Sequence, residues 1–349
     1  MNYADEINSL RNRIAEIKKF ASKEWVASKT EAAWSRLIGP DGDFADWATM
    51  IVSMPDLIGH GVTITIKKGT TLTEVCNIEN KHGLNSDAFI KVQAEKYFPT
   101  SGNIPTATGG DATHLIDAGQ SWVPDEFIDC WAFIVDGTGT NNGYVKITGN
   151  DATSLTVAGW TTQPDNTSRY IIVGALIDCG GTTYYGFNVF GNTCIIELWG
   201  IGVDDADLYG INIRNCFRIG NIRYCGIYGS DRAGIFSETT FYLRLNQSGI
   251  VNNNTDNEAT MGGIVVNGAQ YAVIRRSGIS DNNQRGIYIA RMSFASVDDN
   301  FGDNNGDWGT YAEDGGQARM SGVECSGGLG NHSDPGTAGA ASSDQAVAY

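Results

Sequence analysis

Positive charge and proline are both scarce in this 349-residue chain. Lysine and arginine total 24 against 40 aspartate and glutamate residues, which gives a formal net charge of −16. An acidic surface repels phosphate backbones and anionic lipid, so we expect neither a nucleic-acid partner nor binding to a membrane surface. Charged residues make up only 18% of the chain, whereas disordered chains combine high charge with low hydrophobicity. The 44 glycines suit a β-rich protein with many turns, because glycine adopts positive φ at little steric cost.

Long hydrophobic runs are also missing. No apolar stretch approaches membrane-spanning length, and the opening Met-Asn-Tyr-Ala-Asp-Glu lacks the features of a signal peptide. We therefore expect no membrane insertion, and a chain that is made and folded in a cytoplasm.

The motifs of common catalytic and metal sites are absent as well. The seven cysteines are unevenly spaced and include no CxxC pair, which argues against a disulfide framework or a zinc site. We expect these thiols to be buried as small hydrophobic groups. GxSxG, HExxH and phosphate-loop motifs do not occur, and the four histidines lie far apart. The sequence therefore predicts no metal site and no cofactor.

A heptad pattern begins the chain. Residues 5–38 predict a helix, and its apolar seam has the alternating spacing of three and four residues that is typical of coiled coils. The seam comprises Ile7, Leu10, Ile14 and Ile17. Isoleucine at both core positions favours trimers, so residues 1–40 are interpreted as a trimerising and attachment region. An amphipathic helix that packs on its own domain is the alternative.

Residues 41–109 are interpreted as a capping helix followed by the first coils of a β-solenoid. Phe44, Trp47, Met50 and Ile51 predict a short helix over residues 43–54, ended by Pro55. Residues 62–66 then alternate between apolar and polar side chains, which is the spacing of a strand. A solenoid needs such a cap because its open end would expose unpaired strand edges.

A repeat runs through residues 174–325. Successive units begin with a glycine, at 24, 24, 29, 23 and 23 residues apart: Gly186, Gly210, Gly234, Gly263, Gly286 and Gly309. Each unit holds three short strand patterns, so one period of about 23 residues corresponds to one coil of a three-faced parallel β-helix. Stacked coils align equivalent side chains, so we expect an aromatic stack of Phe217, Phe241, Tyr271 and Phe294. We expect an amide ladder in the turns from Asn253, Asn282 and Asn304.

Two segments do not follow this period. Residues 110–173 alternate strand patterns with glycine turns, which predicts a small antiparallel β module inserted into the solenoid. Residues 326–349 are small and polar and are interpreted as a flexible tail. The predicted fold class is thus all-β.

The combination resembles phage tailspike and tail-fibre proteins. The heptad helix is followed by an entry segment, residues 43–66, and residues 122–169 are similar to a small β module of phage structural proteins. The resemblance implies a right-handed parallel β-helix and a homotrimer in the virion tail, made in the cytoplasm of a bacterial host. It also implies attachment to other tail or baseplate proteins through the N-terminal region. In that group the trimer binds, and often cleaves, host surface polysaccharide.

Carboxylate pairs are the first candidates for such chemistry, because glycoside hydrolysis requires two of them about 5 to 9.5 Å apart. Asp207 and Asp231 occupy the same offset in successive units and are expected to be neighbours. Two solvated turn residues are the simpler interpretation of this pair. Other acids that could meet on the solenoid are Glu197, Asp204, Asp205 and Glu238.

Outward aromatic residues are the second candidates, because sugar rings stack on their faces. The alternation of the strands points to Trp199, Tyr209, Tyr228, Tyr288 and Trp308. A subunit interface would use the same side chains, and both interpretations stay open. With few coils and no compelling acid pair, a structural protein that binds the host surface is favoured. A polysaccharide depolymerase, either an endoglycosidase or a lyase, is the alternative, and a free-standing enzyme similar to pectate lyases comes third.

Overall fold

A computed structural model describes residues 34–84, 88–100, 102–268, 270–322, 324–327 and 330–333, with side chains up to residue 322. The predicted heptad residues Ile7, Leu10, Ile14 and Ile17 lie outside the described residues. No helix in the described part of the chain is both long and apolar enough to cross a membrane.

Most of the described chain forms a parallel β-helix with three sheets, here called A, C and D. Sheet A contains nine strands: β1 (Trp34–Ile38), β3 (Val62–Ile66), β7 (Phe89–Ala94), β16 (Ile195–Trp199), β19 (Arg218–Arg223), β22 (Tyr242–Asn246), β25 (Tyr271–Arg275), β28 (Phe294–Asp298) and β31 (Gln317–Ser321). Sheet C contains β4 (Thr71–Leu72), β14 (Ala175–Asp178), β17 (Ile201–Asp204), β20 (Gly226–Tyr228), β23 (Gly249–Val251), β26 (Gly278–Ser280), β29 (Phe301–Asn305) and β32 (Glu324–Gly327). Sheet D contains β5 (Cys76–Glu79), β15 (Tyr185–Phe190), β18 (Tyr209–Arg214), β21 (Ala233–Glu238), β24 (Gly262–Asn267), β27 (Arg285–Ala290), β30 (Trp308–Ala312) and β33 (Gly330–Ser333).

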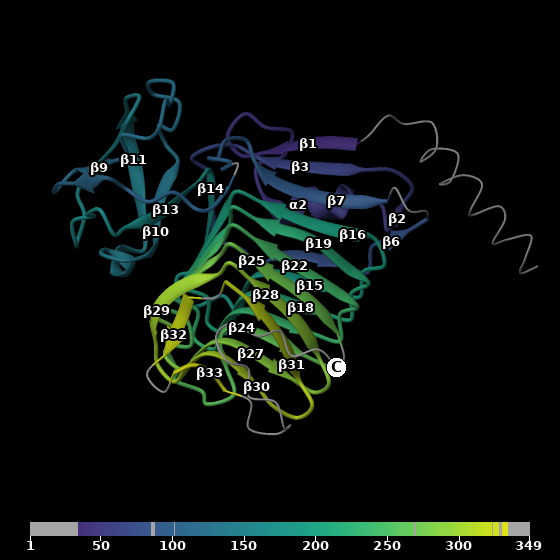
Figure 1. Cartoon of the computed structure of the whole chain (residues 1–349). Coiled ribbons are helices and arrows are strands. Elements are labelled where there is room, and N and C mark those ends of the chain that lie inside the picture. Colours follow the sequence, from purple (N-terminus) through teal and green to yellow (C-terminus); the bar gives the residue numbers. More distant parts are fainter. Residues whose placement is uncertain are drawn as a thin grey trace, which may run out of the picture.

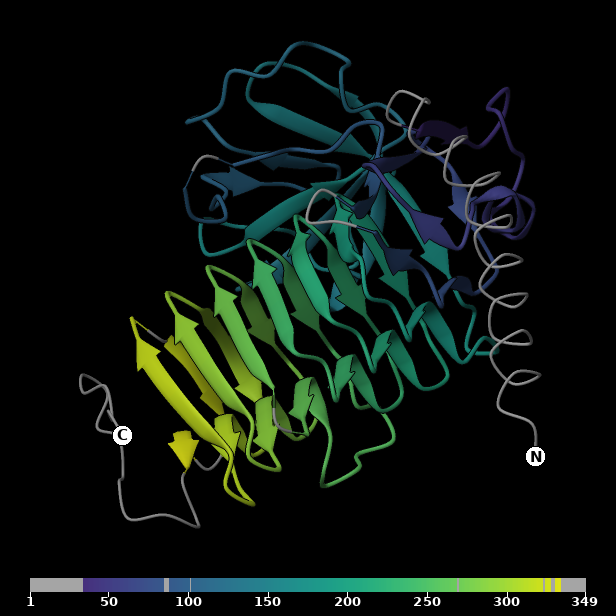
Figure 2. The same ribbon diagram turned by 90° about the vertical axis from the view of Figure 1, so that its right-hand side faces the viewer.

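Each coil visits the three sheets in the order A, C, D. From β14 onward, neighbouring strands within a sheet are therefore three elements apart in sequence, as in β16, β19 and β22, and they pair in parallel. Figure 1 and Figure 2 show the coils stacked along one axis, from purple and teal at the start to yellow at the end. The parallel β-helix predicted from the glycine period is confirmed.

The predicted helix over residues 5–38 is wrong at its end. Residues 34–38 form strand β1, which pairs in parallel with β3 from Trp34↔Val62 to Ile38↔Ile66. Ile38 is fully buried under the first coil. The helical spacing is overridden here because β1 supplies hydrogen-bond partners to an edge of β3 that would otherwise be open.

The capping helix is α2 (Trp47–Ser53). Asp46 accepts a hydrogen bond from the Thr49 amide at 2.7 Å, which satisfies a free donor of the first turn. Trp47 and Met50 are buried, and the Trp47 ring meets Phe187 of sheet D edge-on at 5.8 Å. The helix thus covers apolar residues at the N-terminal end of the solenoid. Beside it lies a two-stranded pair of β2 (Leu57–Ile58) and β6 (His82–Gly83).

Inward side chains form continuous columns through the solenoid. In sheet D, Ile211, Ile235, Ile264 and Ile287 are register partners, and all are buried. Burying each such side chain contributes about 1.5–3 kcal/mol. A repeated glycine stands directly before each isoleucine of this column, because atoms of the adjacent coil leave no room for a Cβ at that position. A Cβ on Gly210 would lie 2.8 Å from the carbonyl oxygen of Gly234 in the next coil.

The turns between sheets C and D are held by a buried amide ladder. Asn282 Oδ1 accepts from the Asn253 amide at 3.0 Å, and Asn305 Oδ1 accepts from the Asn282 amide at 3.3 Å. Each side-chain amide also donates to the preceding coil, as Asn282 Nδ2 does to the carbonyl of Ile250 at 3.1 Å. The predicted ladder is therefore confirmed with one correction: Asn305 takes the place of Asn304, which adopts φ +59 instead.

Six cysteines lie in the interior as free thiols: Cys76, Cys130, Cys179, Cys194, Cys216 and Cys225. Burial raises their pKa values, to about 12 for Cys225. The prediction of buried thiols is confirmed for these six.

A six-stranded antiparallel sheet is inserted into the coil that contains β7 and β14. It comprises β8 (Gly109–Gly110), β9 (His114–Ile116), β10 (Trp131–Asp136), β11 (Tyr144–Asn150), β12 (Ser154–Val157) and β13 (Arg169–Val173), with the 3₁₀ turn η1 (Thr140–Asn142) between β10 and β11. This module has its own core around Trp122, Phe127 and Leu155. In Figure 1 it stands to the left of the first coils.

The module packs on sheet C over a column of glycines. Gly202, Gly226, Gly249 and Gly278 are register partners in successive coils, and side chains of β10 and β11 fill the space above them. A Cβ on Gly226 would lie 2.6 Å from the Tyr144 hydroxyl, and one on Gly278 would lie 2.9 Å from Val135. The Ser280 hydroxyl donates to the Val135 carbonyl at 3.0 Å. Sheet C is therefore covered by the chain itself, which leaves sheet A as an outward face beside the module.

Candidate functional site

The candidate site is the outward face of sheet A from β7 to β31, here called the sheet A face. Alternation along each strand turns every second side chain outward, and the parallel register aligns these side chains in rows. One row contains Lys91, Glu197 and Asn221 in register. The next row toward the carboxyl ends contains Gln93, Trp199, Arg223, Asn246, Arg275, Asp298 and Ser321.

Four buried polar atoms on this face have no hydrogen-bond partner among the described residues, and sheet D holds others, such as Asn212 Oδ1 and Arg214 Nε. Asn221 and Asn246 are each only 8% exposed, and neither Oδ1 atom accepts a hydrogen bond from any described residue. The indole Nε1 of Trp199 and the Nε of Arg244 are likewise buried and without an acceptor among the described residues. A buried polar group left unpaired costs about 1–3 kcal/mol. These two acceptors and two donors lie on three consecutive strands and are enclosed by their neighbours, so a polar ligand pairs with them only where the side chains turn toward it.

Electrostatic interactions connect the same strands. The Lys91 ammonium lies 3.8 Å from the centroid of the Trp199 ring, and the Arg223 guanidinium lies 5.7 Å from it. Burial lowers the pKa of Lys91, which Glu197 opposes. Burial raises the pKa of Glu197, and Lys91, Arg218 and Arg244 oppose this shift. The face therefore keeps charged groups in a partly desolvated setting, where their interactions with a ligand are stronger than in water.

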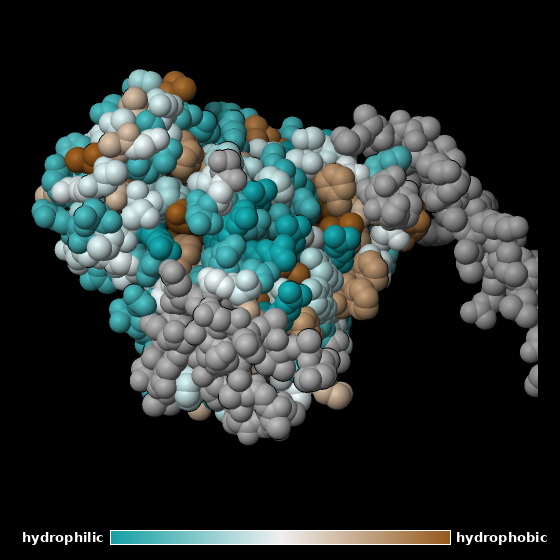
Figure 3. Space-filling view, viewed as in Figure 1, coloured by the Kyte–Doolittle hydropathy of each residue, from teal (hydrophilic) through white to brown (hydrophobic). Residues whose placement is uncertain are grey.

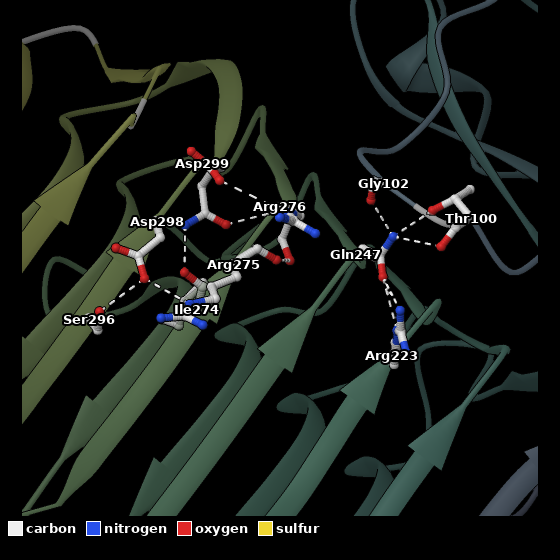
Figure 4. A network of polar contacts seen from close by, with 12 residues as sticks. Thr100, Gly102, Arg223, Gln247, Ile274, Arg275, Arg276, Ser296, Asp298 and Asp299 are labelled. Carbon is white, nitrogen blue, oxygen red and sulfur yellow. Dashed lines mark hydrogen bonds and ion pairs between the residues drawn. The ribbon is translucent and has the colours of Figure 1, made fainter.

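A cleft of about 370 Å³ lies at the carboxyl ends of these strands, lined by Arg244, Asn246, Arg275, Arg276, Asp298, Asp299 and Ser321. Arg275 Nε contacts Asp298 Oδ2 at 2.8 Å, and Arg276 pairs with Asp299 at 3.9 Å. Figure 4 shows these pairs beside Arg223, whose guanidinium donates to Gln247 Oε1 at 2.6 and 2.9 Å.

The segment that leads into the module borders the same region. Gln247 Nε2 donates to Thr100 Oγ1 at 2.6 Å and also to the Gly102 carbonyl (Figure 4). The Tyr224 hydroxyl donates to the Thr100 carbonyl at 3.0 Å, and Tyr97 stacks on Tyr224. The module connection thus forms one wall beside the sheet A face.

Aromatic side chains mark the opposite margin, at the amino ends of the strands. Phe217 stacks on Phe241 with ring centroids 5.6 Å apart, and Tyr271 stacks on Phe294 at 5.4 Å. The four predicted residues do not form one continuous stack: Phe217 and Phe241 form a pair, whereas Tyr271 is in register with Tyr242 and stacks on both Tyr242 and Phe294. Phe217 and Phe241 are 53% and 69% exposed. Figure 3 shows hydrophilic residues across the middle of the solenoid and hydrophobic ones toward the right-hand margin.

The five aromatic residues singled out from the sequence are not brought together. Trp199 lies on sheet A. Tyr228 lies on sheet C, where its ring meets Phe133 of the module at 6.0 Å. Tyr209, Tyr288 and Trp308 lie on sheet D, and the first two are only 4% and 6% exposed. Tyr209 and Tyr288 pack in a hydrophobic cluster that also includes Phe236 and Val265.

Asp207 and Asp231 lie in the turns between sheets C and D, in successive coils. The Asp231 amide donates to the carbonyl of Ala206, next to Asp207. The Asp231 carboxylate accepts from the Thr255 hydroxyl at 2.6 Å. This arrangement matches turn residues that stack from coil to coil.

A different acid has the altered environment of a catalytic group. Asp204, at the end of β17, is the register partner of Asp178 on β14. Burial, followed by the charges of Asp178 and Asp205, raises its pKa from 3.8 to about 7. Burial, Asp231 and Asp178 also raise the pKa of Asp205. Neighbouring strands lie about 4.8 Å apart, so this site brings two carboxyl groups close together, and the raised pKa of Asp204 keeps more of it protonated near neutral pH than an ordinary aspartate.

Within the residues whose side chains are described, no group of three His, Cys, Asp or Glu is placed to hold an ion.

Comparison with known proteins gives structural similarities only. No protein-family model matches the chain, and no curated protein matches its sequence. One solved structure with a similar fold is the GH136 lacto-N-biosidase from Eubacterium ramulus, at 10% identity and a TM-score of 0.30, covering 92% of this chain and 72% of that one. Another is the tailspike gp61 of Pseudomonas phage phi297, at 10% identity and a TM-score of 0.19, covering 76% and 47%.

A third is the tailspike gp54 of Acinetobacter baumannii bacteriophage AP22, solved in complex with A. baumannii capsular saccharide. It has 10% identity and a TM-score of 0.20, with 75% of this chain and 64% of that chain covered. This chain thus spans less than two thirds of either tailspike. All three TM-scores are below 0.5, so the fold assignment depends on the strand register of this chain.

The sequence analysis missed most of the sheet A face. Trp199 and Glu197 were noted, but Lys91, Asn221 and Asn246 were not, and Arg244 was not expected to belong to a basic patch in so acidic a chain. Lys91 lies before the inserted module and the others after it, so their alignment requires the register between β7 and β16. The sequence did contain one usable signal, the position of each polar residue within its repeat unit. In β22 this position alternates with the buried Leu243 and Leu245, which places Arg244 and Asn246 on the outward side of the strand.

Proposed function

We propose that this chain is a tail-fibre or tailspike-like protein of a phage virion that binds bacterial surface glycan through the sheet A face. The observation that carries the proposal is the group of unpaired buried atoms at Trp199, Asn221, Arg244 and Asn246. A saccharide supplies hydroxyl groups that both donate and accept hydrogen bonds, so it matches both kinds of unpaired atom where these side chains turn toward it. The exposed aromatic pairs at the margin give apolar contact surface for sugar rings.

The assembly proposed for this function is the homotrimer predicted by Ile7, Leu10, Ile14 and Ile17. In this proposal residues 1–40 attach the trimer to another tail or baseplate protein, except for β1, which belongs to the solenoid. Residues 41–109 and 174–325 build the rest of the solenoid together with β33, residues 110–173 form the module, and the residues of 326–349 that follow β33 form a tail. Sedimentation of the full chain should give the mass of three subunits. A stable monomer would contradict the proposed trimer, and the proposed glycan site would still be tested separately by binding.

Glycan binding is tested on immobilised bacterial surface polysaccharides with the full chain and two matched variants. Trp199→Phe removes the Nε1 donor and keeps an aromatic ring, and we expect it to weaken binding by about 5- to 10-fold, the effect of one hydrogen bond. Trp308→Phe makes the same change on sheet D and should leave binding unchanged. If Trp308→Phe weakened binding and Trp199→Phe did not, the site would lie on sheet D.

A depolymerase is the second candidate, and the Asp178–Asp204 pair favours it. A retaining glycosidase uses two carboxyl groups about 5–5.5 Å apart, one of them protonated as a general acid. In this alternative the protonated Asp204 would donate the proton and Asp178 would act as the second carboxylate. Release of reducing ends from a bound polysaccharide that is lost in Asp204→Asn, but retained in Asp231→Asn, would establish the enzyme. Absence of release by the wild-type chain from every polysaccharide that it binds would exclude it.

A further inference from the structure

The sheet A face carries a charge opposite to that of the whole chain. From β7 to β31 six cations belong to these strands: Lys91, Arg218, Arg223, Arg244, Arg275 and Arg319. Two carboxylates, Glu197 and Asp298, share the same outward rows. The formal charge of the chain is −16, so this concentration of cations does not follow from composition.

Several of these cations are not neutralised within the described structure. Asp298 pairs with Arg275 at 2.8 Å. Arg218 and Arg244 form no ion pair with any described residue. Both oppose the rise in the pKa of Glu197 that burial causes. Arg244 also has a buried Nε without an acceptor. A cation held in a partly desolvated position without a partner attracts an anionic group more strongly than one in water.

Trp199 supports the same conclusion. The Lys91 ammonium lies 3.8 Å from its ring centroid, so the indole holds a cation in place on that face of the ring. The ring therefore contributes less as a stacking surface for a neutral sugar than its exposure on a sheet would suggest. The Trp199 Nε1 and the Arg244 Nε are both hydrogen-bond donors without an acceptor among the described residues.

The remaining unpaired atoms require donors. Asn221 and Asn246 are more than nine-tenths buried and each presents an Oδ1 without a partner among the described residues. A simple anion cannot satisfy them, because it has no proton to donate. A ligand with hydroxyl groups and an anionic group matches the two acceptors and the two donors together where these side chains turn toward it.

We infer that the sheet A face selects acidic saccharides, in which a carboxylate is received by Arg244 and its neighbouring cations and hydroxyl groups are received by Asn221 and Asn246. The inference rests on the proposed glycan-binding function and narrows it to one ligand class. The cleft at Arg244, Asn246 and Arg275, of about 370 Å³, has the size of small-molecule sites in general.

The test uses an array of bacterial surface polysaccharides in which each carboxylated polymer is printed beside its own carboxyl-reduced, neutral form. The full chain should bind at least one acidic polymer, with an affinity that falls as salt rises, and should bind the reduced form at least 10-fold more weakly. Arg244→Gln should weaken binding to the acidic polymer by about 10- to 100-fold, as expected for loss of a hydrogen bond to a charged group. Arg291→Gln is the matched control, because Arg291 lies in a turn outside sheet A and its side chain is 67% exposed.

The outcomes separate the two proposals. Equal or tighter binding to the neutral forms would overturn the inference of an acidic ligand and leave the glycan-binding function standing. No binding to any polymer on the array, in either form, would count against the function itself. Poly-glutamate serves as an anion without hydroxyl groups: if it bound as tightly as the acidic polymer and Asn246→Ala changed neither, recognition of a saccharide would be ruled out.

Discussion

The Lys91 ammonium lies 3.8 Å from the centroid of the Trp199 ring. The inserted module separates these residues in sequence, yet they stand on β7 and β16, which are adjacent strands of sheet A. Glu197, the register partner of Lys91, opposes the lowering of the Lys91 pKa that burial causes. One side of the candidate site therefore depends on a coil that closes only after the chain has left to form the module and returned.

This relationship predicts a titration effect. Glu197→Gln removes the charge that raises the pKa of Lys91 while its burial remains, so the pKa of Lys91 should be lower in the variant than in the wild-type chain. NMR titration of the lysine side-chain signals measures it. Asp299→Asn, which changes a carboxylate paired with Arg276, should leave the pKa of Lys91 where it is in the wild-type chain. A rise in the pKa of Lys91 in Glu197→Gln would contradict the assignment.

The glycine column of sheet C predicts how the module is held. Gly249→Val places side-chain atoms where Val135 of β10 packs, so we expect the module to detach while the coils remain folded. Amide hydrogen exchange should rise across β10 and its contacts on sheet C and stay slow in the inward columns of sheet D. Gly109→Ala, a change within the module with no atom within 4 Å of the added Cβ, should exchange like wild type. Uniformly faster exchange over both parts would show that the two do not separate.

The turn ladder predicts a stability loss. Asn282→Ala removes the acceptor of the buried Asn253 amide and the donor to the Ile250 carbonyl. Each buried group left unpaired should lower the free energy of unfolding by about 1–3 kcal/mol. Urea unfolding measures the change, and Asn283→Ala, at the adjacent exposed position, is the control. Equal unfolding midpoints for the two variants would mean that the ladder contributes nothing to stability.

Asp204 predicts a dependence of stability on pH. Its folded-state pKa is about 7 against an ordinary 3.8, through burial and then the charges of Asp178 and Asp205. The folded state therefore holds a proton that the unfolded state releases, and this contribution to stability is complete below about pH 4 and is lost as pH rises toward 7. Asp204→Asn cannot ionise, so its stability relative to wild type should increase between pH 4 and pH 7 by roughly 1–4 kcal/mol. Thermal unfolding at a series of pH values measures this, and a constant difference between the two proteins would refute it.

The features predicted correctly from the sequence depend on interactions that repeat in every unit, whereas the features that were missed depend on residues distant in sequence. The glycine period from Gly186 to Gly309 predicted the coils because each unit repeats the same inward column and the same close approach between coils. The strand β1 was missed because its state depends on a partner, β3, and not on its own periodicity. The Asn304 assignment was off by one position because the ladder follows the turn geometry, which places the side chain of Asn305 inward.

The sequence by itself determined the parallel β-helix, its three strands per coil, the antiparallel pattern of the module and the burial of the cysteines, since all of these follow from local alternation and repetition. Only the tertiary structure decided which outward residues share a face. Trp199, Tyr228 and Tyr288 look alike in the repeat but lie on three different sheets. Lys91, Glu197 and Arg244 form one charged face because coils separated by the module stack in register, and no local pattern carries that register.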